Sequence, residues 1–332
     1  MGEDLLRIRD LRVSFRTAGT KLQVIRGFSA DIGKGEITGV LGESGSGKTV
    51  SFNSLLGLID EDTGSIDSGE AVYRGKNLLG MKERELRAIR GRLISYVFQN
   101  PAQAMNPYRS VGNQMTQILR VHGMNHARSN VLDTLRDVGL DRPELVYDMY
   151  PFQLSGGQNQ RAMIALGIVL RPELLIADEP TSFVDTSLRK RILDLFTEIN
   201  AKYRTSIVII THDFDVARHV CHKLIIMYGG LVVEEGSVDE IMSSPLHPYT
   251  EELINCTRSL NSNEKELYSL QGMPLGPHDF EDECPFSRRC RYREEICTRK
   301  IPDIIDRAGR KVRCINRIVD AGPQLRQRSR SA

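Results

Sequence analysis

One glycine-rich segment has the spacing of a phosphate-binding loop. Gly42 to Thr49 reads GESGSGKT, which fits the pattern G-x-x-x-x-G-K-[ST] at every position. In such a loop the backbone N–H groups curl around phosphate oxygens, because glycine tolerates the tight turns that this requires. We predict that Lys48 reaches the β- and γ-phosphates of a nucleotide and that Thr49 is a ligand of Mg²⁺. The alternative is a glycine-rich turn that binds nothing.

A second segment places two carboxylates directly after an apolar run. Leu174 to Pro180 reads LLIADEP, in which four apolar residues precede Asp178 and Glu179. Such a run is typical of a buried strand with acids at its tip. We predict that Asp178 holds Mg²⁺ through its water shell and that Glu179 polarises an attacking water. Taken alone, the segment also fits an ordinary buried strand that ends in an acidic turn.

A third segment has the composition of a second anion-binding turn. LSGGQ, from Leu154 to Gln158, is followed by NQRAMIALGIVL, which reads as a helix, and it ends 20 residues before Asp178. A Ser-Gly-Gly turn that opens a helix can bind an anion through its free N–H groups.

The flanking segments supply the elements that these sites require. EITGVL, before the glycine loop, is typical of a strand, and VSFNSLLGLI, after it, has apolar residues at helical spacing. No apolar run approaches the roughly 18 residues that a membrane span needs. The N-terminus lacks the apolar core of a signal peptide and the myristoylation pattern, so we expect a cytoplasmic location. The net charge of +2 gives no basic excess, and we expect no nucleic-acid partner.

With these three motifs in order, the sequence resembles the ATP-binding subunit of an ABC transporter. LSGGQ matches the signature motif of that family, and Gln99, the segment Ser182 to Asp185, and His212 match its Q-loop, D-loop and switch histidine. The family's D-loop usually reads Ser-Ala-Leu-Asp, whereas here the middle pair is Phe183-Val184. Asp185 is retained, and the departure bears on communication between the two nucleotide sites.

The resemblance implies a role for each motif. Glu179 is implied to be the general base and His212 to contact the γ-phosphate, with Asp185 in the D-loop. Phe15 falls where the family places a ring on the adenine; a core phenylalanine in a strand is the alternative. The implied ligand sets are Phe15, Gly42, Ser44, Gly45, Ser46, Gly47, Lys48, Thr49 and Val50 for nucleotide, Thr49, Gln99 and Asp178 for Mg²⁺, and Ser155, Gly156, Gly157 and Gln158 for the ATP of a partner subunit.

Two further strings resemble the peptide/nickel import branch of the family. These are NPAQAMNPYRSVGNQMTQI, at residues 100–118, and PLHPYT, at residues 245–250. The branch implies an ATP-hydrolysing motor for di- and oligopeptide import, peripheral on the cytoplasmic face of the plasma (inner) membrane. Its implied partners are a second ATPase subunit, which we expect to be a related chain in a heterodimer, two transmembrane permease subunits and, indirectly, an extracytoplasmic substrate-binding protein. Nickel or a metal chelate is the alternative cargo, and a soluble ABC ATPase that acts on ribosomes or DNA is a remote alternative.

Four cysteines near the C-terminus could form a metal site. Cys284, Cys290, Cys297 and Cys314 have wider gaps than the usual zinc knuckle. Such spacing suits a [4Fe–4S] cluster, which some members of the resembled branch carry in this extension; zinc or reduced structural thiols are the alternatives. A metal could staple an extension too small to hold a large core.

The expected fold is an α/β P-loop ABC ATPase core with an antiparallel β part and a helical subdomain, followed by a metal-stapled extension. We place the nucleotide-binding domain at residues 1–250, the helical subdomain at about 99–170, and the extension, with a disordered basic tail, at 251–332.

Overall fold

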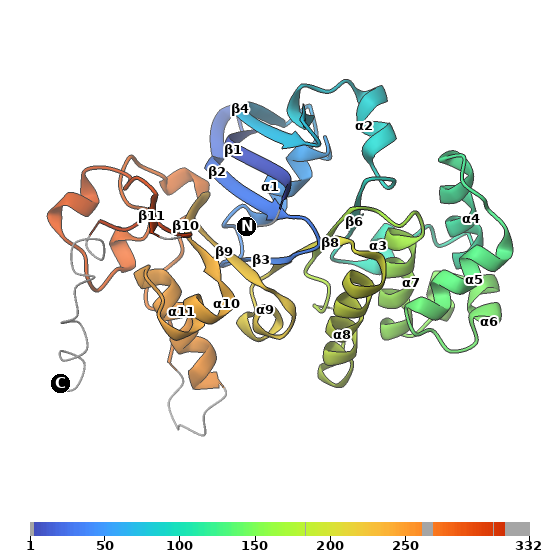
Figure 1. Ribbon diagram of the computed structural model, residues 1–332. Helices are drawn as coiled ribbons and strands as arrows, with labels where there is room; N and C mark the ends of the chain where they lie inside the picture. Colours follow the sequence, from blue (N-terminus) through green and yellow to red (C-terminus); the bar gives the residue numbers. More distant parts are fainter. Residues whose placement is uncertain (1–2, 183, 261–267, 308, 316–332) are drawn as a thin grey trace.

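A mixed sheet of eight strands forms the centre of the molecule in the computed structural model, which describes residues 3–182, 184–260, 268–307 and 309–315 (Figure 1). Its order is β11-β12-β10-β9-β3-β8-β7-β6, and the five strands from β9 to β6 are parallel. The strands are β3 (Ile37–Leu41), β6 (Ile94–Val97), β7 (Leu174–Asp178), β8 (Ser206–Thr211), β9 (Lys223–Tyr228), β10 (Leu231–Ser237), β11 (Ile305–Arg307) and β12 (Arg310–Val312).

The central strands are buried on both faces, which is typical of a parallel sheet that is covered on each side. Every residue of β3, β7 and β8 is buried. Alternate residues of β8 belong to different cores, since Ile207 and Ile209 pack with one cluster and Val208 and Ile210 with the other. The near-continuous apolar strands of the sequence therefore serve two cores at once.

A second, antiparallel sheet covers one of these faces, as expected. Its order is β2-β1-β4-β5, from β1 (Asp4–Thr17), β2 (Thr20–Gly33), β4 (Gly64–Tyr73) and β5 (Lys76–Asn77). Helix α1 (Lys48–Leu55) contributes Phe52 and Leu55 to the core that this sheet shares with the main sheet. The glycine loop therefore lies between β3 and a helix that is fixed on its other side by packing.

Helices surround the main sheet and gather at one end of the molecule (Figure 1). The group α3–α7, drawn in green, follows β6 and ends before β7. The helices are α2 (Glu83–Ile89), α3 (Pro101–Ala104), α4 (Val111–Val121), α5 (Arg128–Asp137), α6 (Pro143–Asp148), α7 (Gly156–Ile168), α8 (Thr186–Tyr203), α9 (Phe214–Val220), α10 (Val238–Ser243) and α11 (Pro248–Leu260), with 3₁₀ turns η1 (Leu78–Gly80), η2 (Pro151–Gln153), η3 (Pro277–Asp279), η4 (Ser287–Arg289) and η5 (Glu295–Thr298). In the described ranges, no helix is long and apolar enough to span a bilayer.

The C-terminal extension is built onto the main sheet. Strand β12 pairs antiparallel with β10, so the hairpin β11–β12 continues the sheet at its edge. Cys284, Phe286 and Cys297 belong to the larger hydrophobic core rather than to a core of their own. The domain boundary at residue 250 stays a prediction, and α11 runs across it. Phe183 and the basic tail lie outside the described residues.

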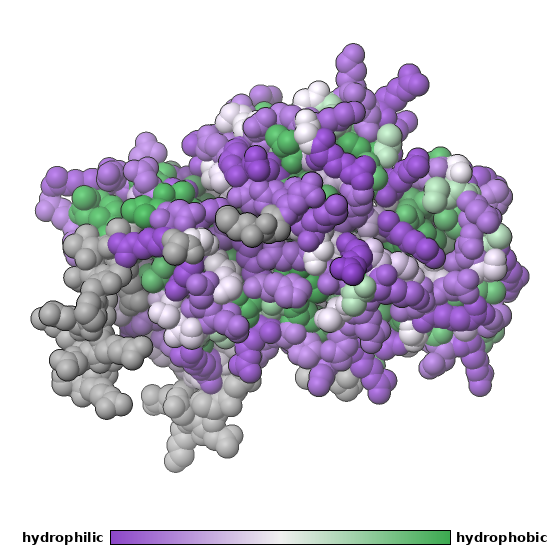
Figure 2. Space-filling view, viewed as in Figure 1, coloured by the Kyte–Doolittle hydropathy of each residue, from purple (hydrophilic) through white to green (hydrophobic). Residues whose placement is uncertain are grey.

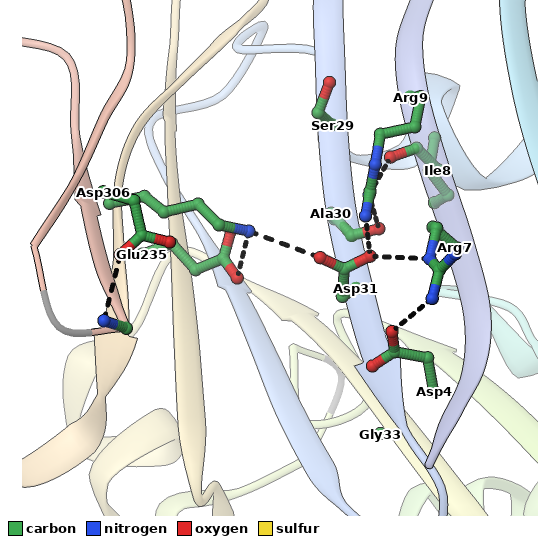
Figure 3. A network of polar contacts seen from close by, with 12 residues as sticks. Asp4, Arg7, Ile8, Arg9, Ser29, Ala30, Asp31, Gly33, Glu235 and Asp306 are labelled. Carbon is green, nitrogen blue, oxygen red and sulfur yellow. Dashed lines mark hydrogen bonds and ion pairs between the residues drawn. The ribbon is translucent and has the colours of Figure 1, made fainter. Parts of the chain in front are cut away.

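A network of charges fastens the hairpin to the antiparallel sheet (Figure 3). The Lys311 ammonium lies 3.4 Å from a carboxylate oxygen of Asp31 on β2 and 3.2 Å from Glu235 on β10. On its other side, Asp31 pairs with Arg9 of β1 at 2.6 Å. On the face shown in Figure 2, hydrophobic side chains form separate groups among a hydrophilic majority, as on an ordinary protein surface.

Candidate functional site

The glycine loop has a backbone that other residues could not adopt without strain. Gly47, which begins α1, has φ 97°, and a Cβ at Gly42 would lie 2.2 Å from the carbonyl oxygen of Met227. Ser44, Gly45 and Thr49 are exposed, whereas Ser46 is buried. The buried Ser46 hydroxyl has no hydrogen-bond partner within the described residues. The loop is therefore a preformed turn with its N–H-bearing tip open to solvent.

Lys48 is folded back onto this loop. Its ammonium donates to the carbonyl oxygens of Gly42 at 2.7 Å and Glu43 at 3.0 Å, and the residue is buried. Burial lowers the pKa of Lys48, while Glu179 and Asp178 oppose that effect. The two carbonyls thus hold a cation beside the loop, where phosphate oxygens could replace them.

Asp178 lies at the end of β7, as predicted, and is buried. The Tyr96 hydroxyl donates to its Oδ2 at 2.9 Å, whereas Oδ1 is buried with no hydrogen-bond partner in the described part of the chain. Burial raises the pKa of Asp178, and hydrogen bonds from Thr49 and Tyr96 offset only part of that shift. A buried carboxylate oxygen that lacks a donor, beside a threonine hydroxyl, fits the oxygen ligands that a hydrated Mg²⁺ requires.

Glu179 and His212 meet at the ends of β7 and β8. The carboxylate Oε1 of Glu179 lies 2.7 Å from Nδ1 of His212, and the Ser182 hydroxyl donates to Oε2 at 3.0 Å. Glu179 has φ 47°, a left-handed conformation that costs a non-glycine residue about 1–2 kcal/mol. Backbone strain at a carboxylate is common at functional sites. Because β7 and β8 are parallel neighbours, their carboxyl ends bring these side chains together.

Three other predicted residues of the nucleotide and Mg²⁺ sites, Gln99, Phe15 and Val50, are exposed or partly buried. Gln99 is exposed, two residues beyond β6, on the same edge of the sheet as Asp178. Phe15 is partly buried in β1 and packs against the core under the antiparallel sheet, so both readings of it stay open. Val50 is likewise partly buried in α1.

The signature segment forms a helix start at a distance from this centre. Ser155 is the N-cap of α7, with a capping box in which Gln158 N–H donates to Ser155 Oγ and Ser155 N–H donates to Gln158 Oε1. Across the described ranges, no hydrogen bond or ion pair joins residues 155–158 to residues 42–50. Asp185, by contrast, is exposed at the N-cap of α8 and makes no side-chain cap hydrogen bond. In the part of the chain that the structure describes, the two motifs therefore share no polar contact.

The four cysteines line one small cavity together with Phe286 and Ser287. Burial raises the pKa of the Cys284 thiol to about 12. The predicted metal staple is not supported, because no group of three His, Cys, Asp or Glu in the described part of the chain could hold a metal ion. The extension is instead held by β12, by Lys311 and by Phe286, whose ring packs 5.4 Å from those of Tyr228 and Tyr249.

Sequence reasoning missed three residues that support the site. Tyr96 could have been found, since it is a hydroxyl-bearing residue in an apolar strand beside β7. Tyr249 and Arg289, which both contact Glu43 of the glycine loop, carry no such signal. They come from segments more than 200 residues away along the chain.

Comparison with known proteins agrees with the geometry. Residues 25–182 match the family model described as ABC transporter, and residues 233–297 match that of the oligopeptide/dipeptide transporter C-terminal region. The chain is 38% identical to the dipeptide transport ATP-binding protein DppD of Bacillus subtilis, over 90% of each chain. It is 36% identical to the oligopeptide transport ATP-binding protein OppD of Salmonella typhimurium, over 90% of this chain and 89% of the relative. The dimeric, post-hydrolysis ATP-binding cassette MJ0796 bound to ADP and Pi is similar in structure, with a TM-score of 0.63 and 25% identity, over 70% of this chain and 98% of that one.

Proposed function

The chain belongs to the family of ABC transporter ATP-binding proteins, and on that premise we propose that it is the ATP-hydrolysing motor of a binding-protein-dependent peptide importer. The observation that carries the proposal is the convergence of Lys48, Asp178, Glu179 and His212 at one edge of the main sheet. The relatives named above serve dipeptide and oligopeptide transport, which favours peptides over nickel as cargo.

The geometry supports a distinct task for each of these side chains. Lys48 would exchange its bonds to two loop carbonyls for bonds to phosphate oxygens. Glu179 would accept the proton of the attacking water, while the His212 ring, 2.7 Å away, orients that carboxylate and reaches the γ-phosphate. Mg²⁺, held by Thr49, Gln99 and Asp178, would neutralise charge that develops on the phosphates.

Turnover in this proposal needs a second ATPase subunit. Within the described residues, no hydrogen bond or ion pair links Ser155, Gly156, Gly157 or Gln158 to the loop of their own chain, and we propose that they contact ATP on a partner. We propose a related, non-identical chain as that partner, with Asp185 at the contact. Closure on two ATP molecules is then a population shift driven by contacts that exist in the closed state.

The partner in the membrane would bind beside the Q-loop. A pocket between β6, α3, α4 and α7 is lined largely by apolar side chains, among them the exposed Phe98 and Val121. We propose that one of the two permease subunits contacts this pocket and that the pair holds the protein at the cytoplasmic face of the membrane. The substrate-binding protein would act on it through them.

The test is ATP hydrolysis by the reconstituted transporter in lipid. Its binding protein is loaded in turn with dipeptides, longer peptides and Ni²⁺ complexes, and phosphate release is measured. Stimulation by peptides is the expected result. Stimulation by a metal complex alone would contradict the peptide assignment, and the absence of any ATP hydrolysis would contradict the motor.

A narrower proposal concerns the cysteine cavity. Four thiols line one cavity, and we propose a [4Fe–4S] cluster rather than zinc because their spacing along the chain is wider than that of a zinc knuckle. We expect Cys290→Ser to remove visible absorption from anaerobically purified protein and to lower its melting temperature. Cys256→Ser, in α11, is the matched control. Colourless wild-type protein, or an unchanged spectrum in Cys290→Ser, would dismiss the cluster.

A further inference from the structure

The extension reaches back into the glycine loop through one side chain. We propose that Arg289 is a positioning residue for that loop, which it shapes by holding and neutralising Glu43. Arg289 Nη1 lies 2.7 Å from Glu43 Oε2, and Nη2 donates to Oε1 at 3.0 Å, a bidentate pair between residues 246 positions apart. The inference rests on the proposed nucleotide-binding role of residues 42–50.

Glu43 is fixed at three points, and each concerns the shape of the loop. Its N–H donates to the Tyr249 hydroxyl at 2.9 Å, its carboxylate is paired with Arg289, and its carbonyl accepts from Lys48 at 3.0 Å. Because the carbonyl and the carboxylate belong to one residue, releasing the carboxylate loosens the atom that positions the Lys48 ammonium. Arg289 thus acts on the phosphate site through Glu43.

Arg289 is itself held rigidly, so the pair has a defined geometry. Its side chain is 4% exposed, and it donates to the carbonyl oxygen of Gln271 and to the hydroxyl of Tyr228. Burial lowers the pKa of Arg289, but hydrogen bonds to Glu43 and Tyr228 outweigh that effect and leave the pKa raised. A planar, permanently charged guanidinium suits a buried bidentate pair better than a lysine would.

The pair with Arg289 also neutralises the charge of Glu43 beside the phosphate site. Glu43 occupies a freely variable position of the phosphate pattern, where an acid would repel a triphosphate. Arg289 cancels that charge. Lys311, by contrast, pairs with Asp31 and Glu235 rather than with the glycine loop, so it attaches the extension without acting on the phosphate site.

The experiment is an equilibrium titration of the full-length chain with a fluorescent ATP analogue and Mg²⁺. We expect Arg289→Ala to raise the Kd roughly tenfold, which corresponds to about 1.4 kcal/mol. Adding Glu43→Gln to that variant should bring the Kd back to within about threefold of wild type, because the uncancelled charge is removed while the side chain at position 43 stays unheld. Arg288→Ala is the matched control, since Arg288 pairs with Glu281 and Glu283 within the extension, and its Kd should stay unchanged.

Two outcomes would overturn the inference. One is a wild-type Kd in Arg289→Ala; the other is a double variant that binds as weakly as Arg289→Ala alone, which is the pattern of a merely structural contact. If Arg289→Ala does not fold, Arg289→Lys replaces it, with an expected loss of roughly threefold. Lys48→Ala separates this result from the proposed function: equal binding by Lys48→Ala and wild type would refute the nucleotide role of the loop itself.

Discussion

Glu179→Gln tests the catalytic centre with the smallest change in shape. Glutamine has the size of glutamate, and its amide can still bond His212 Nδ1 and the Ser182 hydroxyl, which lie 2.7 Å and 3.0 Å from the two carboxylate oxygens. What disappears is the charge that accepts a proton from water. The left-handed backbone at this position is retained, so we expect no loss of stability.

The expected loss follows from the role of a general base. Positioned bases contribute about 10²–10⁴ in rate, or about 2.7–5.4 kcal/mol of barrier at 1.36 kcal/mol per tenfold. Nucleotide binding should be kept or strengthened, because a negative charge next to the phosphate site is removed. Single-turnover phosphate release measures the first effect, and size-exclusion chromatography with ATP and Mg²⁺ measures accumulation of the closed dimer.

The matched control lies at the other end of the same strand. Glu173 directly precedes β7, at the end opposite to Asp178 and Glu179. There it pairs with Arg74 and accepts a hydrogen bond from the Tyr73 hydroxyl. Glu173→Gln should hydrolyse ATP at the wild-type rate. If Glu179→Gln stays within about fivefold of wild type, the reasoning that makes Glu179 the base is wrong.

Three further predictions concern the attachment of the extension, each measured by chemical denaturation. Lys311→Met should lower the free energy of unfolding by about 1–3 kcal/mol, because it leaves buried Glu235 with one cation fewer. An unchanged denaturation midpoint would show that Lys311 does not stabilise the attachment. Burial raises the pKa of Asp31, but Arg9 and Lys311 outweigh it and lower that pKa, so its stabilisation is complete above about pH 4 and lost as pH falls through the lowered value. Asp31→Asn should therefore flatten the acid loss of stability, and an identical pH profile would refute this. Phe286→Ala should lower the free energy of unfolding by about 3–5 kcal/mol, since the ring is buried. A loss below about 1 kcal/mol would show that the packing of this ring does not hold the extension in place.

The edge of the main sheet that carries Asp178, Glu179 and His212 was predictable, because apolar runs in the sequence mark the strands that end there. Apolar runs predicted β3, β7 and β8, and the carboxyl ends of neighbouring parallel strands necessarily share one edge. Asp178, Glu179 and His212 therefore lie at that edge, and their roles in binding and hydrolysis stay predictions. The φ of 47° at Glu179 was not predictable, since no local feature of LLIADEP demands it.

Contacts between distant segments were beyond sequence reasoning. Arg289 is one of many arginines in the extension, and nothing in ECPFSRRC indicates which one reaches Glu43. The expectation that a metal is needed to hold the extension together is not supported, because the extension does not depend on a core of its own. Its Phe286 in fact packs against Tyr228 and Tyr249 of the ATPase.

The hairpin β11–β12 also protects the edge of the main sheet against pairing with other molecules of the same chain. Without it, the outer side of β10 would present unpaired N–H and C=O groups, a template on which a strand from another molecule can add. The hairpin pairs with β10 at Glu234 and Glu235, and its own outer border is a three-residue strand, Ile305–Arg307, in which Asp306 and Arg307 are exposed. Charged, short borders discourage such growth. A chain shortened before residue 305 would therefore be expected to self-associate, whatever its ATPase site retains.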